Sequence, residues 1–137
     1  MQSRDDIDFS ALAATLKQWG RELGFDAVGI TDTELTEAES HLHNWLSKDF
    51  HGEMSWMHSH GSKRTHPEQL VEGTLRVISV RMNYLPDEPD PTHLLEEPTH
   101  AFISRYALGR DYHKVLRQRL QKLADKIAAH IGPFGYR

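Results

Sequence analysis

The chain has 137 residues, of which 38% are hydrophobic and 26% charged, a composition that predicts one soluble globular domain. It contains no cysteine, which excludes disulfides and any zinc or iron–sulfur cluster held by cysteine thiolates of this chain. The N-terminus is polar and acidic, and the apolar runs are too short to span a membrane, so we expect a cytoplasmic protein without a secretory signal or membrane contact.

The first third of the chain predicts a helix, a strand and a second helix. The first helix is expected over Ser10–Leu23, whose apolar residues recur at steps of three and four. The run Phe25–Ile30 reads as a short buried strand. The spacing of Thr36 and Glu39 is that of a capping box and predicts a helix from there to about Lys48.

The next stretch, Phe50–Pro67, is rich in histidine, methionine and tryptophan. Its four histidines do not have the spacing of a zinc site, so we predict no metal, although a metal-binding loop stays open as an alternative. We expect a loop with one helical turn over Glu53–His58, followed by a turn over Glu68–Val71 that Pro67 begins. A more specific alternative is that this loop covers a pocket for a large flat ligand.

Two further strands are expected on either side of a long loop. Leu75–Tyr84 alternates apolar and polar residues and is the clearest strand signal of the chain. Leu85–Thr99 carries four prolines and five acidic residues without a lysine or arginine, which predicts a surface loop. Ala101–Tyr106 contains β-forming side chains and predicts another short strand.

A long helix follows a glycine turn. Gly109 permits the turn, and Asp111 is a preferred N-cap. An apolar row then runs at steps of three and four through Tyr112, Leu116, Leu120, Leu123, Ile127 and Ile131. Phe134–Arg137 looks like the opening of another strand, so we expect the chain to be a fragment of a longer protein.

The same helix is basic. Six lysines and arginines against two aspartates give Arg110–Lys126 a local charge of +4, in a chain of net charge −4. This contrast favours a polyanionic partner, although a merely solvated face remains the alternative. The candidate nucleic-acid contacts are Arg110, Lys114, Arg117, Arg119 and Lys122. The predicted strand, the turn at Gly109 and the start of the helix together form a strand–turn–helix unit. The helix N-terminus in such a unit often binds an anion or a cofactor, but the same unit is also common in proteins without a ligand there.

Four segments together resemble the epoxyqueuosine reductases. They are ELGFDAVGITD at Glu22–Asp32, HGEMSWM followed by Arg64, GTLRVISVRMNYLP at Gly73–Pro86, and SRYALGRDYHKVLR at Ser104–Arg117. The likeness runs in order from about Phe9 to the last residue, which makes it far more specific than one short motif.

The resemblance implies an α+β fold, a single domain like those of nitroreductases and reductive dehalogenases, with a mixed sheet flanked by helices and a truncated last strand. Residues 1–8 would be disordered and residues 9–137 would form the N-terminal cobalamin-binding domain. Family members reduce epoxyqueuosine to queuosine at the wobble position of tRNA, using cobalamin and two [4Fe–4S] clusters. The clusters and the catalytic Asp would lie beyond this chain, so we expect the isolated chain to be inactive.

The resemblance also implies site residues. Arg64 and Ser104 are the first candidates for cobalamin contacts, and Arg105, Tyr106, Tyr112 and His113 are further ones. The expected partner is a tRNA with a queuosine-type anticodon, bound by a monomer without a stable protein partner. The alternative function is a cysteine-free module that binds a corrinoid or tRNA without reducing it.

Overall fold

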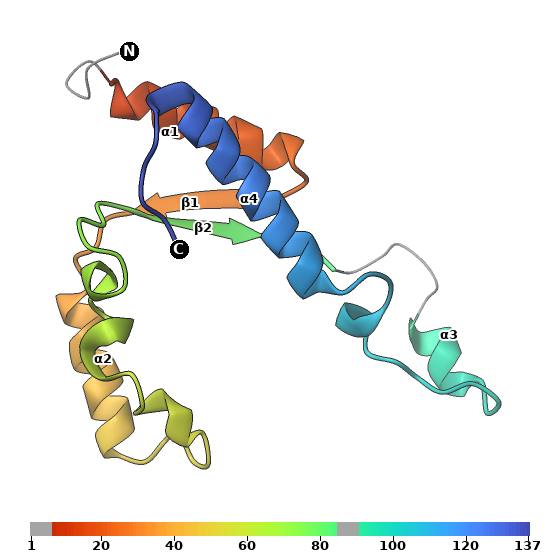
Figure 1. The fold of residues 1–137 in the computed structure, drawn as a ribbon. Helices are drawn as coiled ribbons and strands as arrows, with labels where there is room; N and C mark the ends of the chain where they lie inside the picture. Colours follow the sequence, from red (N-terminus) through yellow and green to blue (C-terminus); the bar gives the residue numbers. More distant parts are fainter. Residues whose placement is uncertain (1–6, 85–90) are drawn as a thin grey trace. The chain divides into compact units, whose positions relative to one another are not determined.

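The computed structural model describes residues 7–84 and 91–137. Its longer elements, in chain order, are α1 (Phe9–Glu22), β1 (Ala27–Thr31), α2 (Thr36–Ser47), β2 (Val77–Arg81), α3 (Pro91–Glu96) and α4 (Tyr112–Ile131) (Figure 1). Short 3₁₀ helices lie between them, namely η2 (Ser55–Met57), η3 (Gly61–Arg64), η4 (Pro67–Gln69) and η5 (Arg105–Ala107). The chain divides into a first unit, Met1–Val28 with Val80–Gly132, and a second unit, Gly29–Ser79 with Pro133–Arg137.

The core of the first unit forms where α1 and α4 pack together. Its buried apolar side chains are Leu12, Leu16, Phe25, Leu123, Ala124 and Ile127. Full burial of one such leucine or isoleucine contributes about 1.5–3 kcal/mol. The predicted apolar row of α4 is therefore confirmed at Leu123 and Ile127, whereas Tyr112 and Leu120 in its first half are exposed.

Both helices of this core begin at an aspartate. The Asp8 carboxylate accepts hydrogen bonds from the backbone N–H groups of Ser10 (2.9 Å) and Ala11 (3.0 Å), so α1 begins just before the predicted start. The Asp111 carboxylate accepts one from the N–H of His113 at 2.9 Å, which confirms the predicted N-cap of α4.

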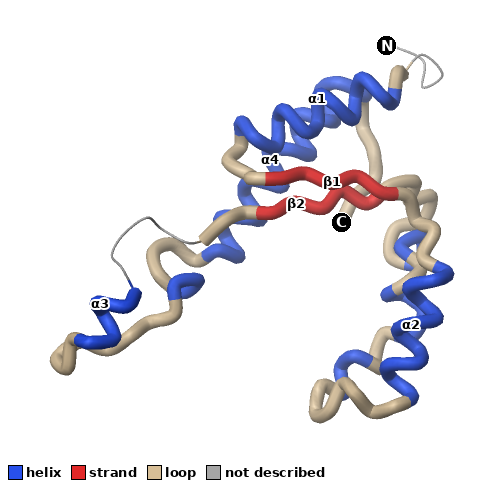
Figure 2. Tube along the Cα trace, turned by 180° about the vertical axis from the view of Figure 1, so that it is seen from behind, coloured by secondary structure: helices blue, strands red, loops and turns tan. Residues whose placement is uncertain are grey.

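The sheet has two strands among the described residues, β1 and β2. They run antiparallel and lie side by side in both views (Figures 1 and 2). The N–H of Asp26 donates to the carbonyl oxygen of Arg81 at 2.8 Å and continues the pairing past β1. The α+β class is thus confirmed, while the strand predicted over Leu75–Tyr84 is confirmed only for its middle residues.

Three predictions on the second half of the chain were wrong. Ala101–Tyr106 and Phe134–Arg137 are not strands, and α3 occupies part of the predicted loop Leu85–Thr99, of which residues 85–90 lie outside the described part. Phe102 and Ile103 are exposed and pair with no strand among the described residues. β-forming side chains favour a strand only when a neighbouring strand and a buried face are present.

The predicted capping box of α2 was also wrong. Thr36 is the first helical residue, and Leu35 at the N-cap has no side-chain acceptor. The carboxylate of Glu34 caps the start of α2 instead. It accepts hydrogen bonds from the backbone N–H of Thr36 at 3.0 Å and from the Thr36 hydroxyl. The carboxylate of Glu39 is therefore free to bond to Thr65 instead.

Across residues 7–84 and 91–137, every helix is too short or too polar to cross a membrane.

Candidate functional site

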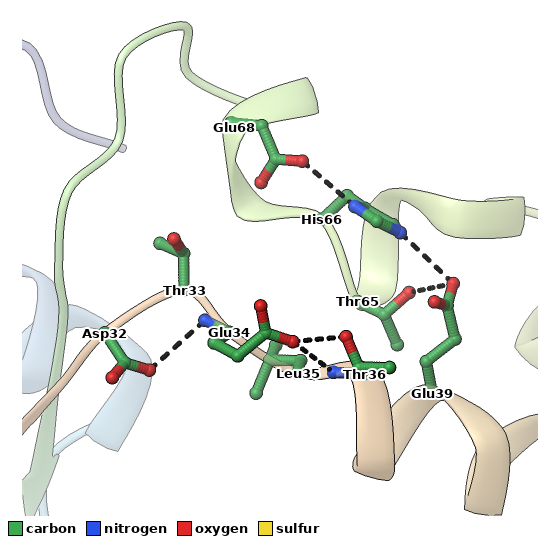
Figure 3. A pocket seen from close by; sticks show the side chains of 9 residues that line it. All are labelled: Asp32, Thr33, Glu34, Leu35, Thr36, Glu39, Thr65, His66 and Glu68. Atoms are coloured by element: carbon green, nitrogen blue, oxygen red, sulfur yellow. Dashed lines mark hydrogen bonds and ion pairs between the residues drawn. The ribbon is translucent and has the colours of Figure 1, made fainter.

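A cavity of about 350 Å³ lies in the second unit, where the chain passes from β1 into α2 (Figure 3). The opposite wall comes from the end of η3 and the start of η4. The lining residues are Asp32, Thr33, Glu34, Leu35, Thr36, Glu39, Thr65, His66 and Glu68. The cavity is therefore lined mainly by carboxylates and hydroxyls.

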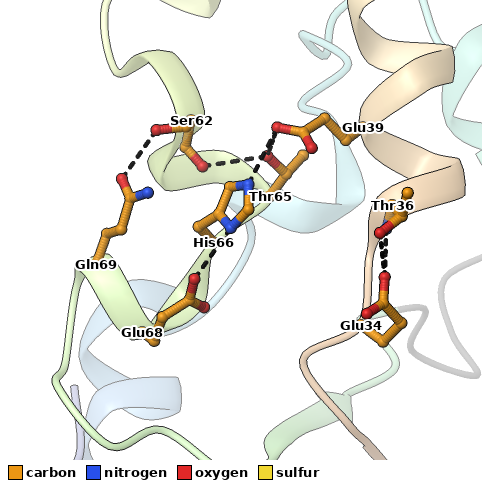
Figure 4. Close-up of polar contacts among 8 residues, drawn as sticks. All are labelled: Glu34, Thr36, Glu39, Ser62, Thr65, His66, Glu68 and Gln69. Atoms are coloured by element: carbon orange, nitrogen blue, oxygen red, sulfur yellow. Dashed lines mark hydrogen bonds and ion pairs between the residues drawn. The ribbon is translucent and has the colours of Figure 1, made fainter.

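His66 bridges two of these carboxylates (Figure 4). Its Nδ1 lies 3.0 Å from Oε1 of Glu68, and its Nε2 lies 3.2 Å from Oε1 of Glu39. The hydrogen bond with Glu68, supported by the charge of Glu39, raises the pKa of His66. The buried Thr65 hydroxyl donates to Glu39 at 2.8 Å, and this bond is the main cause that lowers the pKa of Glu39.

This acidic lining decides which ligands the cavity suits. Carboxylates accept hydrogen bonds and repel anions, so the cavity favours hydrogen-bond donors and cations over phosphate groups. The cavity was not predicted from the sequence, because Glu39 was assigned to a capping box with Thr36. The dense run of acids and hydroxyls at Thr31–Glu39 was the available signal.

Arg64 lies in the same unit, but its guanidinium group turns toward its own loop. Nε donates to the carbonyl oxygen of Met57 at 3.1 Å, and Nη2 donates to that of Trp56 at 2.9 Å. The guanidinium carbon also lies 5.3 Å from the centre of the Trp56 ring. The carboxylate of Glu68, a nearby acid in the sequence, contacts His66. The two bonds use two of the five N–H groups of the guanidinium.

The histidines of this loop pack as rings. His51 is buried, and its ring centre lies 4.4 Å from that of His58 and 5.9 Å from that of Trp45. Within the described ranges, no three His, Asp or Glu side chains form a group that could hold a metal ion.

The other predicted cobalamin contacts lie in the first unit, just before and at the start of α4. The ring centres of Tyr106 and Tyr112 are 6.2 Å apart in an edge-to-face arrangement, and His113 stacks on Tyr112 at 4.0 Å. Ser104 is exposed and occupies the cap position of η5. The structure thus gathers five of the six candidates in one segment, whereas Arg64 belongs to the second unit.

The predicted nucleic-acid contacts divide into two kinds. Four of them are exposed, namely Arg110, Lys114, Arg117 and Lys122. Arg119 is half-buried, and its Nη1 donates to the carbonyl oxygen of Gly24 at 2.6 Å. Its contact with RNA stays a prediction, but the structure already gives its guanidinium a role within the fold.

The chain was compared with families and proteins that are already known. A model of the family described as "Epoxyqueuosine reductase QueG, DUF1730" matches residues 64–137. Proteins named epoxyqueuosine reductase are similar over nearly the whole chain: that of Pseudomonas aeruginosa is 58% identical over 95% of it, that of Salmonella typhimurium 54% over 96%, and that of Escherichia coli 53% over 97%. The chain covers 36%, 34% and 35% of these three proteins, about a third of their length. No solved structure matches.

Proposed function

The chain belongs to the epoxyqueuosine reductase family, and from this premise we propose that it is the N-terminal part of a cytoplasmic oxidoreductase that reduces epoxyqueuosine to queuosine at the tRNA wobble position. The observation that carries the proposal is similarity over at least 95% of the chain to proteins of that name. In this proposal the chain is a monomer that contributes a tRNA-binding surface and individual contacts to cobalamin from each of its two units. A nitroreductase-like core belongs to the same proposal.

The tRNA-binding surface consists of the exposed cations of α4, Lys114, Arg117 and Lys122, together with Arg110, which lies just before the helix. Phosphate contacts supply much of the affinity for nucleic acids, and lysine and arginine are the side chains that make them. The only aspartate in the first turn region, Asp111, is engaged with backbone and side-chain nitrogens of His113.

The hydrogen-bond donors of the candidate residues support the proposed cobalamin contacts. Cobalamin has amide and phosphate groups along its edge, and hydroxyl and guanidinium groups suit both. In the first unit, Ser104 and Arg105 are of this type, with Tyr106, Tyr112 and His113 as further candidates. In the second unit, the remaining N–H groups of Arg64 are a separate candidate contact. When bound, cobalamin supplies the electrons that open the epoxide, and this chain's residues hold and orient the group. The two [4Fe–4S] clusters need cysteines that this chain lacks, so other parts of the parent would hold them.

The absence of cysteine also favours a second candidate, a module that binds tRNA or a corrinoid without reductase activity. The two candidates differ in the parent protein, which must contain cluster-binding cysteines only if it is the enzyme.

Two binding measurements test the proposal. The purified chain is mixed with hydroxocobalamin and desalted, and retention of the corrin absorbance is expected; Arg64→Ala should lower it more than Arg76→Ala, a change at another arginine of the second unit. The chain is also titrated into fluorescent tRNA, where Arg117→Glu with Lys122→Glu should weaken binding. The matched control, Lys17→Glu with Arg21→Glu, changes the net charge equally on α1. Equal binding by both double variants would reject the tRNA-binding surface.

A further inference from the structure

We propose that Tyr106, Tyr112 and His113 form an aromatic array that stacks an unpaired base of single-stranded RNA. The inference rests on the proposed function in one respect, that the nucleic acid is RNA. It assigns to this array a partner different from the cobalamin considered above.

The array is assembled before any ligand binds. His113 is its outermost ring, with 72% of its side chain exposed, and its inner face stacks on Tyr112 at 4.0 Å with an angle of 28° between the rings. Asp111 lies 3.2 Å from Nδ1 of His113 and limits rotation of the ring. Tyr106 then meets Tyr112 edge to face at 6.2 Å. Because the rings are already ordered, little side-chain freedom is lost when a ligand stacks on them.

The three rings are accessible to a ligand. Tyr106 is 56% exposed and Tyr112 38% exposed, although both are large aromatic residues. None of the three belongs to the buried core of the first unit, which is formed by aliphatic side chains and Phe25. Exposed aromatic faces of this kind stack nucleobases with little dependence on base identity.

Positive charges near the array favour a nucleic acid as its partner. Arg110 lies between Tyr106 and Tyr112 in the chain, Lys114 directly follows His113, and both cationic side chains are exposed. Cations beside an aromatic platform are the combination that binds single strands, because the bases stack while the phosphates meet the positive charges. A base within a duplex has both faces covered, so the array favours unpaired loop bases.

The test uses the whole chain and a single-stranded RNA heptamer that carries one 2-aminopurine, whose fluorescence falls when it stacks. We expect quenching on addition of the chain, and no comparable binding of a fully paired RNA of the same length. His113→Ala removes only the exposed ring and should weaken binding of the heptamer about ten-fold, as should Tyr112→Ala. Tyr112→Phe keeps the ring and should retain binding. Tyr84→Ala, at another exposed tyrosine of the first unit, is the matched control.

The outcomes separate this inference from the proposed function. Unchanged affinity and quenching in both alanine variants overturn the array, while the charge-reversal effect on tRNA would still stand. Equal binding of heptamer and duplex also overturns it. If both alanine variants lose retention of hydroxocobalamin but bind the heptamer normally, the array is a corrin contact and the inference is wrong.

Discussion

Arg119 and Gly24 are 95 residues apart, and the Nη1 atom of Arg119 donates to the carbonyl oxygen of Gly24 at 2.6 Å. The same nitrogen lies 3.0 Å from the sulfur of Met82. The arginine thus ties α4 to the end of α1. Two features favour glycine at position 24. Its φ is 84°, and a Cβ there would come within 2.9 Å of the Arg119 guanidinium.

We therefore expect Arg119→Ala to lower the free energy of unfolding by about 1.5–3 kcal/mol, the range for a hydrogen bond with a charged partner. Arg117→Ala, at an exposed position of the same helix, should change it by less than about 0.5 kcal/mol. Urea unfolding of both variants measures the difference. Equal values would mean that the bond to Gly24 adds nothing to stability.

Gly20 is buried within α1, and a Cβ at this position would collide with Cγ2 of Val28. Alanine is favoured over glycine in helices by about 1 kcal/mol, yet we expect Gly20→Ala to destabilise the chain by about 1–3 kcal/mol because Val28 must shift to admit the added methyl group. Val28→Ala in the same chain should recover part of the loss. A Gly20→Ala variant more stable than the wild type would contradict the packing of α1 on Val28.

The cluster of Glu39, His66 and Glu68 predicts a pH-dependent stability. The pKa of His66 is raised from 6.5, so its contribution is fully present below pH 6.5 and is lost as the pH rises through the raised pKa. The pKa of Glu39 is lowered from 4.5, so its contribution is present above pH 4.5 and is lost as the pH falls through the lowered pKa. Both contributions are therefore complete between pH 4.5 and pH 6.5.

His66→Asn should accordingly destabilise the chain more at about pH 5.5 than at about pH 8.5. His60→Asn, at an exposed histidine of the same loop, is the matched control and should show no such difference. Urea midpoints at the two pH values measure the effect. The same loss for His66→Asn at both values would show that the charged form of His66 is not stabilised by its neighbours.

The isolated chain should not convert tRNA that contains epoxyqueuosine, even with a chemical reductant. It has no cysteine and so no thiolate to hold the clusters that recharge the cofactor in the proposed parent. Nucleoside analysis of the treated tRNA, beside a full-length relative as the positive control, measures conversion. Queuosine formed by a preparation free of other enzymes would overturn this expectation.

Local signals in the sequence were sufficient for the long helices α1 and α4, but not for the short helix α3. α1 and α4 were predicted within a few residues because their apolar rows and the Asp111 cap are short-range features. The turn at Gly109 was also predicted, and its φ of 79° agrees. The predicted strand Ala101–Tyr106 failed because strand formation depends on a partner that local propensity does not specify.

The candidate site was predicted less well, since its contacts join distant residues. The bonds from Glu39 to Thr65 and His66 span 26 and 27 residues, and no spacing rule relates such positions. The inward turn of Arg64 onto the carbonyls of Trp56 and Met57 likewise depends on the path of the loop. By contrast, the basic character of α4 was visible from composition alone, although the separate role of Arg119 was not.

The salt dependence of tRNA binding tests the central claim most directly. If Arg110 and the three exposed cations of α4, Lys114, Arg117 and Lys122, contact phosphates, the logarithm of the association constant should fall with the logarithm of salt concentration with a slope of about −3 to −4. Arg117→Glu with Lys122→Glu should reduce the magnitude of that slope by about 2, whereas Lys17→Glu with Arg21→Glu should leave it unchanged. A slope near zero for the wild type, or the same slope in the α4 variant, would contradict the claim that α4 faces the tRNA.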